Sequence, residues 1–378
     1  MFETIVAFIR QLYNTEGFIP LHAPVFRGNE KKYVIETIDS TYVSSVGKFV
    51  NRFEEMVCDY TQAKFAVATV NGTSALHLAL VISDIRQGDL VITQPLSFIA
   101  TCNAIKYTGA DPLFIDIDKA TLSLSAEKLR FFLKENSYIR DNECFHKQTG
   151  RRIKACIPMH TFGQAAEIDR ISEICESFNL ILIEDAAESL GTIYKTKHTG
   201  TFGLFGIYSF NGNKTITCGG GGMIVTNNEM LAKLAKHLST QAKVTHHWDF
   251  VHDYIGYNYR LPNINAALAC AQMEELEKLI ASKRTIAEEY KNFFSTTTIK
   301  YISESSGTRS NYWLNAILLE NKDERDAFLA CTNNNDVTTR PCWRLMHKLD
   351  MFKNSPAGDL TDAEWIEDRL VNIPSSPI

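Results

Sequence analysis

The run LILIED at residues 180–185 gives the clearest indication of a fold in this sequence, because four consecutive apolar residues lead into two carboxylates. A strand that is apolar on both faces is typical of the centre of a parallel sheet covered by helices on both sides. We therefore expect an α/β protein with this strand near the middle of its sheet.

The chain before this run alternates between short β-rich runs and helical stretches, which is the pattern of a mainly parallel sheet flanked by helices. Predicted strands are residues 65–70, 89–94, 112–118 and 154–160. Predicted helices are residues 75–82, 98–107, 126–135 and 167–178. The polar stretch 136–152 is expected to be a surface excursion, and residues 1–13 a short amphipathic helix.

The pattern changes after about residue 245, where a long helical segment at 263–294 replaces the alternation. A strand is predicted within 311–320 and a helix at 324–334. The sequence therefore predicts a large domain at 1–245, which includes an N-terminal arm, and a smaller C-terminal α/β domain at 246–378.

The composition limits the possible functions. The chain has 378 residues, 45% of them apolar, and a net charge of 39 − 44 = −5. A mildly acidic protein without a basic patch is not expected to bind nucleic acid, and no apolar run approaches the ~20 residues that a membrane span needs. The nine cysteines contain no CxxC pair, so we expect reduced, buried thiols in a cytoplasmic protein.

Four groups of residues at the ends of predicted strands could carry chemistry, since open α/β sheets bind ligands there. The first is Asn71-Gly72-Thr73-Ser74, where a glycine turn opens a helix. Exposed backbone N–H groups and the helix dipole suit a phosphate at such a position. Ordinary helix capping by Asn71 without a ligand explains the same residues and is the more frequent case.

The second group is the pair Glu184 and Asp185 at the end of LILIED. A buried carboxylate must find a partner, because an unpaired buried charge is costly. An arginine, a metal ion or a protonated ring nitrogen would each serve, and the motif alone does not choose among them.

The third group surrounds Lys214, in the loop SFNGNK at residues 209–214, which four consecutive glycines follow at 219–222. Lysine forms Schiff bases with carbonyl compounds once its amine is deprotonated. Most lysines are solvated surface residues, but the small, polar neighbours here favour a ligand. The glycine run has the wrong spacing for a dinucleotide-binding loop.

The fourth is Phe98, which follows a predicted strand and could stack on a planar ring, although core packing is the more frequent role of phenylalanine. A phosphate cradle, an acid, a lysine and an aromatic plate together match the phosphate, pyridine nitrogen, aldehyde and ring face of pyridoxal phosphate.

These residues stand in longer runs that resemble the sugar aminotransferases of the DegT/DnrJ/EryC1/StrS group over nearly the whole chain. The runs include SSVGKFVNRFE, NGTSALHLAL, PMHTFGQAAEID, IEDAAESLG, SFNGNKTITCGGGGMIVTN, GYNYRLPNINAALACAQ, SNYWLN, TRPCW and NIPSSP. The resemblance implies the type I (aspartate aminotransferase) fold, pyridoxal phosphate as cofactor, no metal, and an obligate homodimer with a shared active site.

The resemblance also implies roles for individual residues. Lys214 would hold the cofactor as a Schiff base, Asp185 would pair with its pyridine nitrogen, and His160 would lie beside the ring. The cofactor-binding residues would be Gly72, Thr73, Ser74, Phe98, Asp185, Glu188, Ser209, Lys214 and, from the other subunit, Asn258. Glu188 stands where the wider family often has glutamine, and Gly219–Gly222 where it often has G-E-G-G, which we interpret as marks of a subfamily.

The implied reaction is a transamination in which glutamate donates its amino group, leaves as 2-oxoglutarate, and a nucleotide-linked 4-keto-6-deoxy sugar becomes a 4-amino sugar. We expect a UDP-linked 2-acetamido-4-keto-2,6-dideoxyhexose, as in the bacillosamine and legionaminate branch. Substrate contacts are predicted at Arg260, Arg340, Trp343 and His347, with Arg344 as a further cation. For the segment 340–347, a surface helix with ordinary charges is an equally good interpretation.

Three alternatives remain at this point. Perosamine synthases share SSVGKF and the lysine loop but use a GDP-sugar. Sugar dehydratases on the same fold use the same cofactor, and some of them replace the lysine with histidine. A non-catalytic scaffold that kept the fold is the third, since fold does not imply function. The presence of Lys214 and Asp185 argues against the last two.

Overall fold

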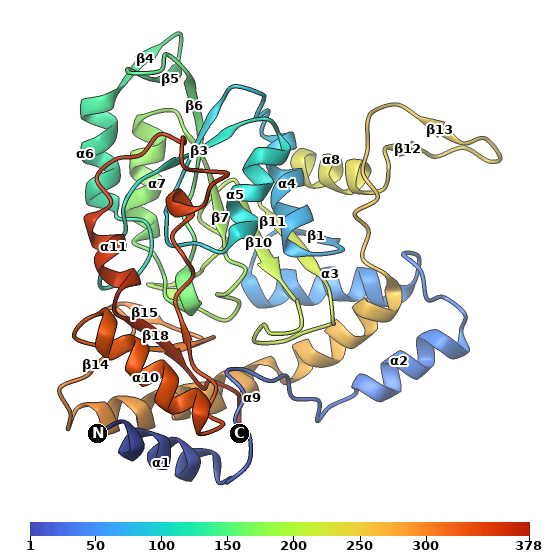
Figure 1. Cartoon of the computed structure of the whole chain (residues 1–378). Helices are drawn as coiled ribbons and strands as arrows, with labels where there is room; N and C mark the ends of the chain where they lie inside the picture. The colour runs from blue at the N-terminus through green and yellow to red at the C-terminus, as the bar shows by residue number, and fades with distance from the viewer.

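The computed structural model describes residues 1–378, and a sheet of seven strands with a two-stranded extension forms its centre (Figure 1). In order across the sheet, the strands are β1 (Phe65–Thr69), β11 (Gly222–Thr226), β10 (Phe205–Ser209), β7 (Ile181–Asp185), β6 (Arg152–Ile157), β2 (Leu90–Thr93) and β3 (Asp111–Phe114). The run LILIED therefore supplies the middle strand, as predicted.

Helices cover both faces of the sheet because its strands are apolar on both sides. One face packs against α4 (Gly72–Ile82), α5 (Ile99–Tyr107) and α8 (Glu229–Ser239). The other packs against α6 (Ala126–Asn136) and α7 (Ile168–Ser177) at one end, and against α3 (Lys48–Thr61) and α9 (Asn263–Phe294) at the other. Burial of these two layers is the main source of stability of the large unit.

Only β11 is antiparallel to its neighbours, β1 and β10. All adjacent pairs from β10 to β3 are parallel. The reason lies in the connection: residues 210–221 link β10 to β11 without a helix, and a parallel crossover requires a longer connection. This loop carries Lys214. It folds back over the edge where β1, β10 and β7 end, so Lys214 meets the residues that follow those strands.

A second, four-stranded antiparallel sheet belongs to the C-terminal part of the chain. Its order is β14 (Lys300–Tyr301), β16 (Asn315–Leu318), β18 (Leu370–Ile373) and β17 (Arg340–Pro341). Its core also contains side chains of α1 (Phe2–Tyr13), α10 (Lys322–Asn334) and the last turns of α9. The predicted domain boundary between residues 245 and 246 stays a prediction. The two units share elements across it, because α1 packs on the C-terminal sheet and α9 contributes to the cores of both units.

The remaining elements are short or peripheral. They are α2 (Glu30–Asp39), α11 (Thr361–Glu367), the 3₁₀ turns Thr161–Gly163 and Met346–Lys348, the hairpin β12 (Lys243–Val244) and β13 (Val251–His252), and the small sheet of β15 (Thr308–Arg309), β8 (Ile193–Tyr194) and β9 (Lys197–His198). All nine cysteines are free, and seven are buried. None of the helices combines the length and apolar character needed to cross a membrane.

The stretch 136–152 differs from the prediction in one respect. It forms a hairpin of β4 (Ser137–Arg140) and β5 (Glu143–His146), and β5 pairs with β6 to extend the sheet. The strands are four residues long and carry charges. Their stability comes from stacking of Tyr138 on Phe145 and from Arg140 above the same ring, cross-strand contacts that single-strand patterns do not reveal.

Candidate active site

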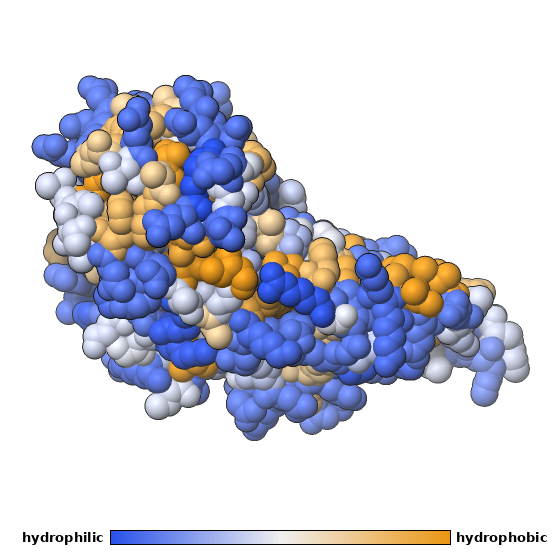
Figure 2. All heavy atoms as spheres, turned by 90° about the horizontal axis from the view of Figure 1, so that it is seen from below, coloured by the Kyte–Doolittle hydropathy of each residue, from blue (hydrophilic) through white to orange (hydrophobic).

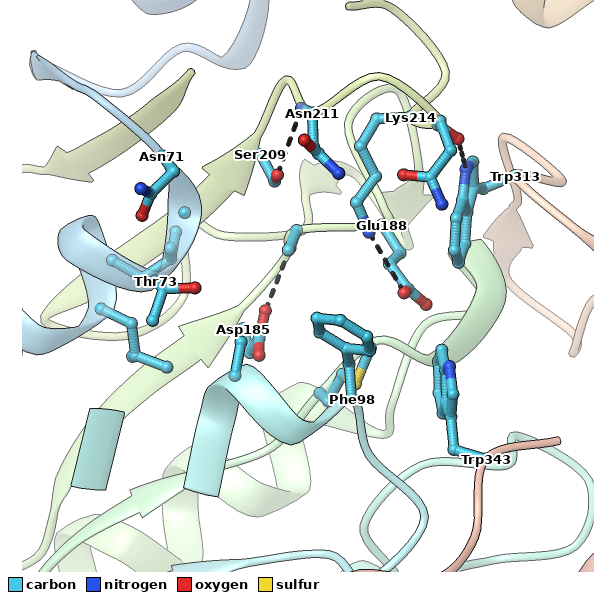
Figure 3. Close-up of a pocket in the computed structure, with 17 residues that line it drawn as sticks. Asn71, Thr73, Phe98, Asp185, Glu188, Ser209, Asn211, Lys214, Trp313 and Trp343 are labelled. Carbon is cyan, nitrogen blue, oxygen red and sulfur yellow. Dashed lines mark hydrogen bonds and ion pairs between the residues drawn. The ribbon is translucent and has the colours of Figure 1, made fainter. Parts of the chain in front are cut away.

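The carboxyl edge of the large sheet is hollowed into a cavity of about 280 Å³ (Figure 3). The sheet, the first turn of α4, the lysine loop and the C-terminal part of the chain all contribute to its walls. The lining residues are Asn71, Gly72, Thr73, Leu76, Phe98, Ala100, Met159, Asp185, Ala187, Glu188, Ile207, Ser209, Asn211, Asn213, Lys214, Trp313 and Trp343.

The first turn of α4 forms one end of the cavity. The Asn71 side chain caps the helix by accepting a hydrogen bond from the Ser74 N–H at 2.8 Å. Capping of that one group leaves the N–H groups of Gly72 and Thr73 without an intrahelical partner, since the first N–H groups of a helix have no carbonyl one turn earlier. Ser209 lies against this turn: a Cβ on Gly72 would lie 3.1 Å from Cβ of Ser209. Ser74 is close by but does not line the cavity.

The glycine run contributes by close packing against the same turn. A Cβ added to Gly222 would lie 2.3 Å from the carbonyl carbon of Asn71, a distance that no side chain tolerates. Gly222 also pairs with Thr69 and Ser209 at the start of β11. The run therefore lets β11 approach the backbone of the helix turn, and it does not itself line the cavity.

Asp185 stands at the opposite side of the cavity, as the last residue of β7. Its Oδ2 accepts a hydrogen bond from the Thr101 hydroxyl at 2.6 Å, and its Oδ1 accepts one from the Ala187 N–H at 3.2 Å. These two donors hold the buried carboxylate in one orientation. Asp185 has no cationic partner within ion-pair distance, so its carboxylate is available to pair with a cationic group of a ligand in the cavity.

The other carboxylate of the pair, Glu184, points away from the cavity. Its oxygens accept three backbone hydrogen bonds, at 2.6–2.8 Å, from the N–H groups of Gly200, Phe202 and Gly203. The remaining partner is His160, whose Nε2 lies 3.1 Å from Glu184 while its Nδ1 accepts a hydrogen bond from the backbone at 3.1 Å. His160 is fully buried and is not among the lining residues, so the structure does not bring it to the cavity.

Lys214 enters the cavity from the loop between β10 and β11. Its Nζ lies 3.2 Å from Oε1 of Glu188 and 4.1 Å from the centre of the Trp313 ring (Figure 3). Glu188 is 2% exposed, and its second oxygen accepts a hydrogen bond from the Phe162 N–H at 2.9 Å. Burial raises the pKa of Glu188 to about 7, although the Lys214 cation and the Phe162 N–H act in the opposite direction.

Aromatic side chains form the wall opposite α4. Phe98 caps α5, remains 46% exposed, and meets Trp343 edge-on at 6.0 Å between ring centres. Trp343 packs against Phe162 at 4.9 Å, and Trp313 completes the wall. The two tryptophans come from the C-terminal part of the chain, so the cavity lies between this part and the sheet.

Sequence reasoning missed Trp313 and the lysine that anchors it. The Trp313 indole N–H donates to the Asn213 carbonyl at 2.6 Å, and the fully buried Lys283 Nζ donates to the Trp313 carbonyl at 3.2 Å. Burial lowers the pKa of Lys283 to about 7. A signal existed: Lys283 falls on the apolar stripe of α9, between Ile280 and Ala287, where a solvated lysine does not belong.

The residues predicted for substrate binding are not gathered in one place. Trp343 lines the cavity, but Arg340 is exposed and donates to Asn333, and His347 lies 3.2 Å from Glu364. Arg344 is exposed and makes no hydrogen bond or ion pair. Segment 339–347 is no continuous helix: it begins as the strand β17 and ends in the 3₁₀ turn Met346–Lys348, so its side chains are not aligned along one helix face.

Asn258 and Arg260 also lie outside the cavity of their own chain. The guanidinium of Arg260 donates to the Asn258 side chain at 3.1 Å, and Asn258 is exposed. The backbone of Arg260 bridges to Thr69, which places this segment beside the end of β1.

The cavity fits pyridoxal phosphate by the chemistry of its donors. The open helix turn with the Ser209 hydroxyl suits the phosphate, and the fixed Asp185 carboxylate without a cation suits a protonated pyridine nitrogen. Lys214 suits the aldehyde, and the ring of Phe98 suits a planar face. The residues needed for the cofactor therefore lie around one cavity of this chain.

Comparison with known protein families matches residues 24–378 to the DegT/DnrJ/EryC1/StrS aminotransferase family. The chain is 36% identical over 366 residues to a GDP-perosamine synthase of Vibrio cholerae, with 95% of this chain and 94% of that protein covered. A GDP-perosamine synthase of Escherichia coli O157:H7 is also 36% identical, over 364 residues, with 95% and 94% covered.

A solved structure, the aminotransferase TlmJ of Streptoalloteichus hindustanus, matches with a TM-score of 0.86 at 24% identity, over 95% of this chain and 94% of that chain. This likeness confirms the predicted aminotransferase fold, with its large mixed sheet and smaller C-terminal sheet. From the whole set of motifs we predicted the bacillosamine-type branch, which uses a UDP-sugar. The names of the relatives favour the GDP-sugar alternative instead. Close packing against the helix turn explains the glycine at 222, whereas a Cβ on Gly220, the position that departs from G-E-G-G, would meet only the Val70 carbonyl at 3.7 Å. The chain belongs to the DegT/DnrJ/EryC1/StrS aminotransferase family, and its cofactor is pyridoxal phosphate.

Proposed function

We propose that the protein transfers an amino group from glutamate to the 4-keto carbon of a GDP-linked 4-keto-6-deoxy sugar. The observation that carries the aminotransferase part is the convergence of Lys214, Asp185 and the open α4 turn on one cavity. The choice of GDP is supported by two proteins named GDP-perosamine synthase, which are 36% identical to this chain over 95% of its length.

Five of the lining residues would bind the cofactor in this proposal. The N–H groups of Gly72 and Thr73, with the Ser209 hydroxyl, hold the cofactor phosphate. Asp185 keeps a proton on the pyridine nitrogen, and Phe98 covers the ring. When bound, pyridoxal phosphate supplies a carbonyl that exchanges with amines and a ring that takes up an electron pair.

Lys214 is the general acid and base of this proposal. Its Nζ would hold the cofactor covalently and, as a free amine, would accept a proton from the donor carbon that bears the nitrogen. The same amine serves the second half of the reaction, in which a proton is delivered to the sugar carbon. His160 lies outside the cavity, so we assign it to positioning: its backbone N–H donates to the Asp185 carbonyl at 3.1 Å.

The aromatic wall suits the sugar end of the substrate. Trp313 and Trp343 offer ring faces and edges on the side of the cavity that is remote from the α4 turn (Figure 3). Apolar contacts of this kind accommodate the methyl group and the C–H faces of a 6-deoxy sugar. Arg344 is the cation of its segment that remains free to meet a diphosphate.

A competition assay tests the nucleotide. With glutamate as donor and equal concentrations of GDP- and UDP-linked 4-keto-6-deoxy sugars, we expect the GDP-sugar to be consumed with at least ~10-fold higher kcat/KM. The products are separated by chromatography and identified by their masses in mass spectrometry. Preference for the UDP-linked 2-acetamido sugar would reverse the choice of substrate and leave the aminotransferase assignment in place.

We also propose a homodimer in which Asn258 reaches the partner's cofactor site. Asn258 is exposed, does not line its own cavity, and follows the projecting hairpin β12–β13. Large apolar side chains near this hairpin and on α2 are open to solvent, among them Trp248, Phe250, Ile255, Ile35 and Ile38. Figure 2 shows hydrophobic atoms near the end of the molecule where α2 projects. Such surfaces are typical of an interface.

The shared site predicts complementation between two defective chains. Asn258→Ala should weaken cofactor binding without unfolding the chain, and Lys214→Ala should be inactive. Mixed after brief dissociation, the two variants should form hybrid dimers with one intact site each, about one quarter of all sites. Activity that does not rise on mixing, or a fully active monomer in sedimentation, would contradict the shared site.

The alternatives are supported less well. A dehydratase of the kind that replaces the lysine with histidine does not match a site in which Lys214 lies 3.2 Å from Glu188. A non-catalytic scaffold gives no reason for a lysine, a fixed carboxylate and an open helix turn to surround one cavity.

A further inference from the structure

We propose that Glu188 stores the proton that Lys214 releases, so that the two side chains act as a proton-exchanging pair inside the cavity. The inference rests on the proposed function, because it concerns the step at which Lys214 must become a free amine.

The geometry permits direct exchange. Oε1 of Glu188 and Nζ of Lys214 are 3.2 Å apart, a hydrogen-bond distance, and both side chains line the cavity. No other carboxylate lies within ion-pair distance of Lys214. The second oxygen of Glu188 is fixed by the Phe162 N–H at 2.9 Å, so the first oxygen stays directed at the amine.

Several contacts act on the proton shared by Glu188 and Lys214, and they act in opposite directions. Burial disfavours two charges and therefore favours the neutral pair, with the proton on Oε1. The Trp313 ring, 4.1 Å from Nζ, favours the ammonium ion, and the Phe162 N–H favours the carboxylate. Asp185 is the other charged group that acts on Glu188, and it raises the proton affinity of the carboxyl group.

The exchange is balanced in atoms and charge. An N–H bond of the Lys214 ammonium breaks, an O–H bond forms at Oε1, and the pair changes from plus and minus to two neutral groups. No solvent or further reactant takes part. The neutral amine has the lone pair that a base or nucleophile needs, and the stored proton returns when the amine next requires it.

The apoprotein gives a test that does not depend on activity. Burial raises the pKa of Glu188 from its ordinary value of 4.5 to about 7, so the native chain takes up a proton on folding between these pH values. The stabilisation is present below pH 4.5 and is lost as the pH rises through 7. Wild-type apoprotein should therefore lose urea resistance between pH 5 and pH 8 relative to Glu188→Gln, which cannot bind this proton.

The loaded enzyme gives the second test. Glutamine keeps the size and the hydrogen bond to Phe162 but accepts no proton. In Glu188→Gln we expect kcat at pH 7 to fall by at least ~10-fold and the acidic limb of its pH profile to move up by ~1 unit or more, because the ammonium must then lose its proton to solvent. The pH midpoint of the cofactor absorbance band should change in the same variant.

Two further variants separate proton storage from a structural role. Glu188→Asp retains a carboxyl group and should recover part of the wild-type pH profile. Glu304→Gln removes a glutamate that pairs with Arg284 at 2.7 Å outside the cavity, and it should leave the acidic limb unchanged.

Parallel urea midpoints of wild type and Glu188→Gln at both pH values, or an unchanged pH profile, would overturn the inference. Wild-type protein that binds the cofactor but transfers no amino group would instead refute the proposed function, and the apoprotein measurement would still decide the proton affinity of Glu188.

Discussion

Lys214→Ala should lower transamination by at least ~10⁴-fold, because the variant loses both the covalent attachment point and the base. No other lysine lines the cavity. The alanine variant should still fold and bind the cofactor non-covalently, since the α4 turn, Asp185 and Phe98 are untouched. Steady-state turnover with the sugar substrate is the measurement.

A covalent readout supports the assignment independently of turnover. After reduction with borohydride, the wild-type peptide that contains residue 214 should carry the mass of the cofactor, and the variant peptide should not. Lys214→Arg keeps the charge and should be as inactive as the alanine variant. Lys195→Ala removes an exposed lysine that pairs with Asp169 and serves as the control with full activity. Turnover near the wild-type level in Lys214→Ala would remove this residue from the mechanism.

Much of the fold followed from the sequence because its strands are strongly apolar and its helices well separated. LILIED became the middle strand, and the long helix over 263–294 has the predicted bounds. The hairpin β4–β5 was missed because its strands are short and their stabilising contacts lie across strands. The antiparallel direction of β11 depends on the length of a loop without a helix, which a pattern of single elements does not express.

The site could be predicted where its residues directly follow strands. Gly72, Thr73, Asp185, Ser209 and Lys214 lie within a few residues of the ends of β1, β7 and β10, and all line the cavity. Their meeting at one edge is a consequence of parallel strands.

Residues from the other part of the chain could not be placed in this way. Trp313 reaches the cavity because Lys283 and Asn213 fix its backbone and indole nitrogen, contacts between segments 30 and 100 residues apart. Arg340 and His347 were proposed from charge alone, and in this structure their side chains contact Asn333 and Glu364, so their contact with substrate stays a prediction. Composition of a segment does not tell which way its side chains point.

Asp185→Asn should lower kcat by about 10²–10³-fold, because it removes one preorganised charge at the reacting group. Asparagine has nearly the same shape and can still accept the Thr101 hydroxyl hydrogen bond, which is 2.6 Å long in the wild type. The change thus removes the charge and keeps the packing. The other lining carboxylate, Glu188, lies 3.2 Å from Lys214, so without Asp185 we expect no stabilised proton on the pyridine nitrogen and a ring that accepts electrons less readily.

The control is Thr101→Val, which removes one hydrogen bond to the same carboxylate and leaves the charge in place. Loss of a hydrogen bond to a charged group is worth about 1.5–3 kcal/mol, or roughly 10- to 150-fold, if its full value appears in the rate. Some of this loss will be recovered, because the backbone N–H of Ala187 continues to orient Asp185. We therefore expect Thr101→Val to be clearly less impaired than Asp185→Asn, and the absorbance of the bound cofactor to change in the asparagine variant alone. Equal losses in both variants would mean that orientation of the carboxylate, and not its charge, is what the reaction requires.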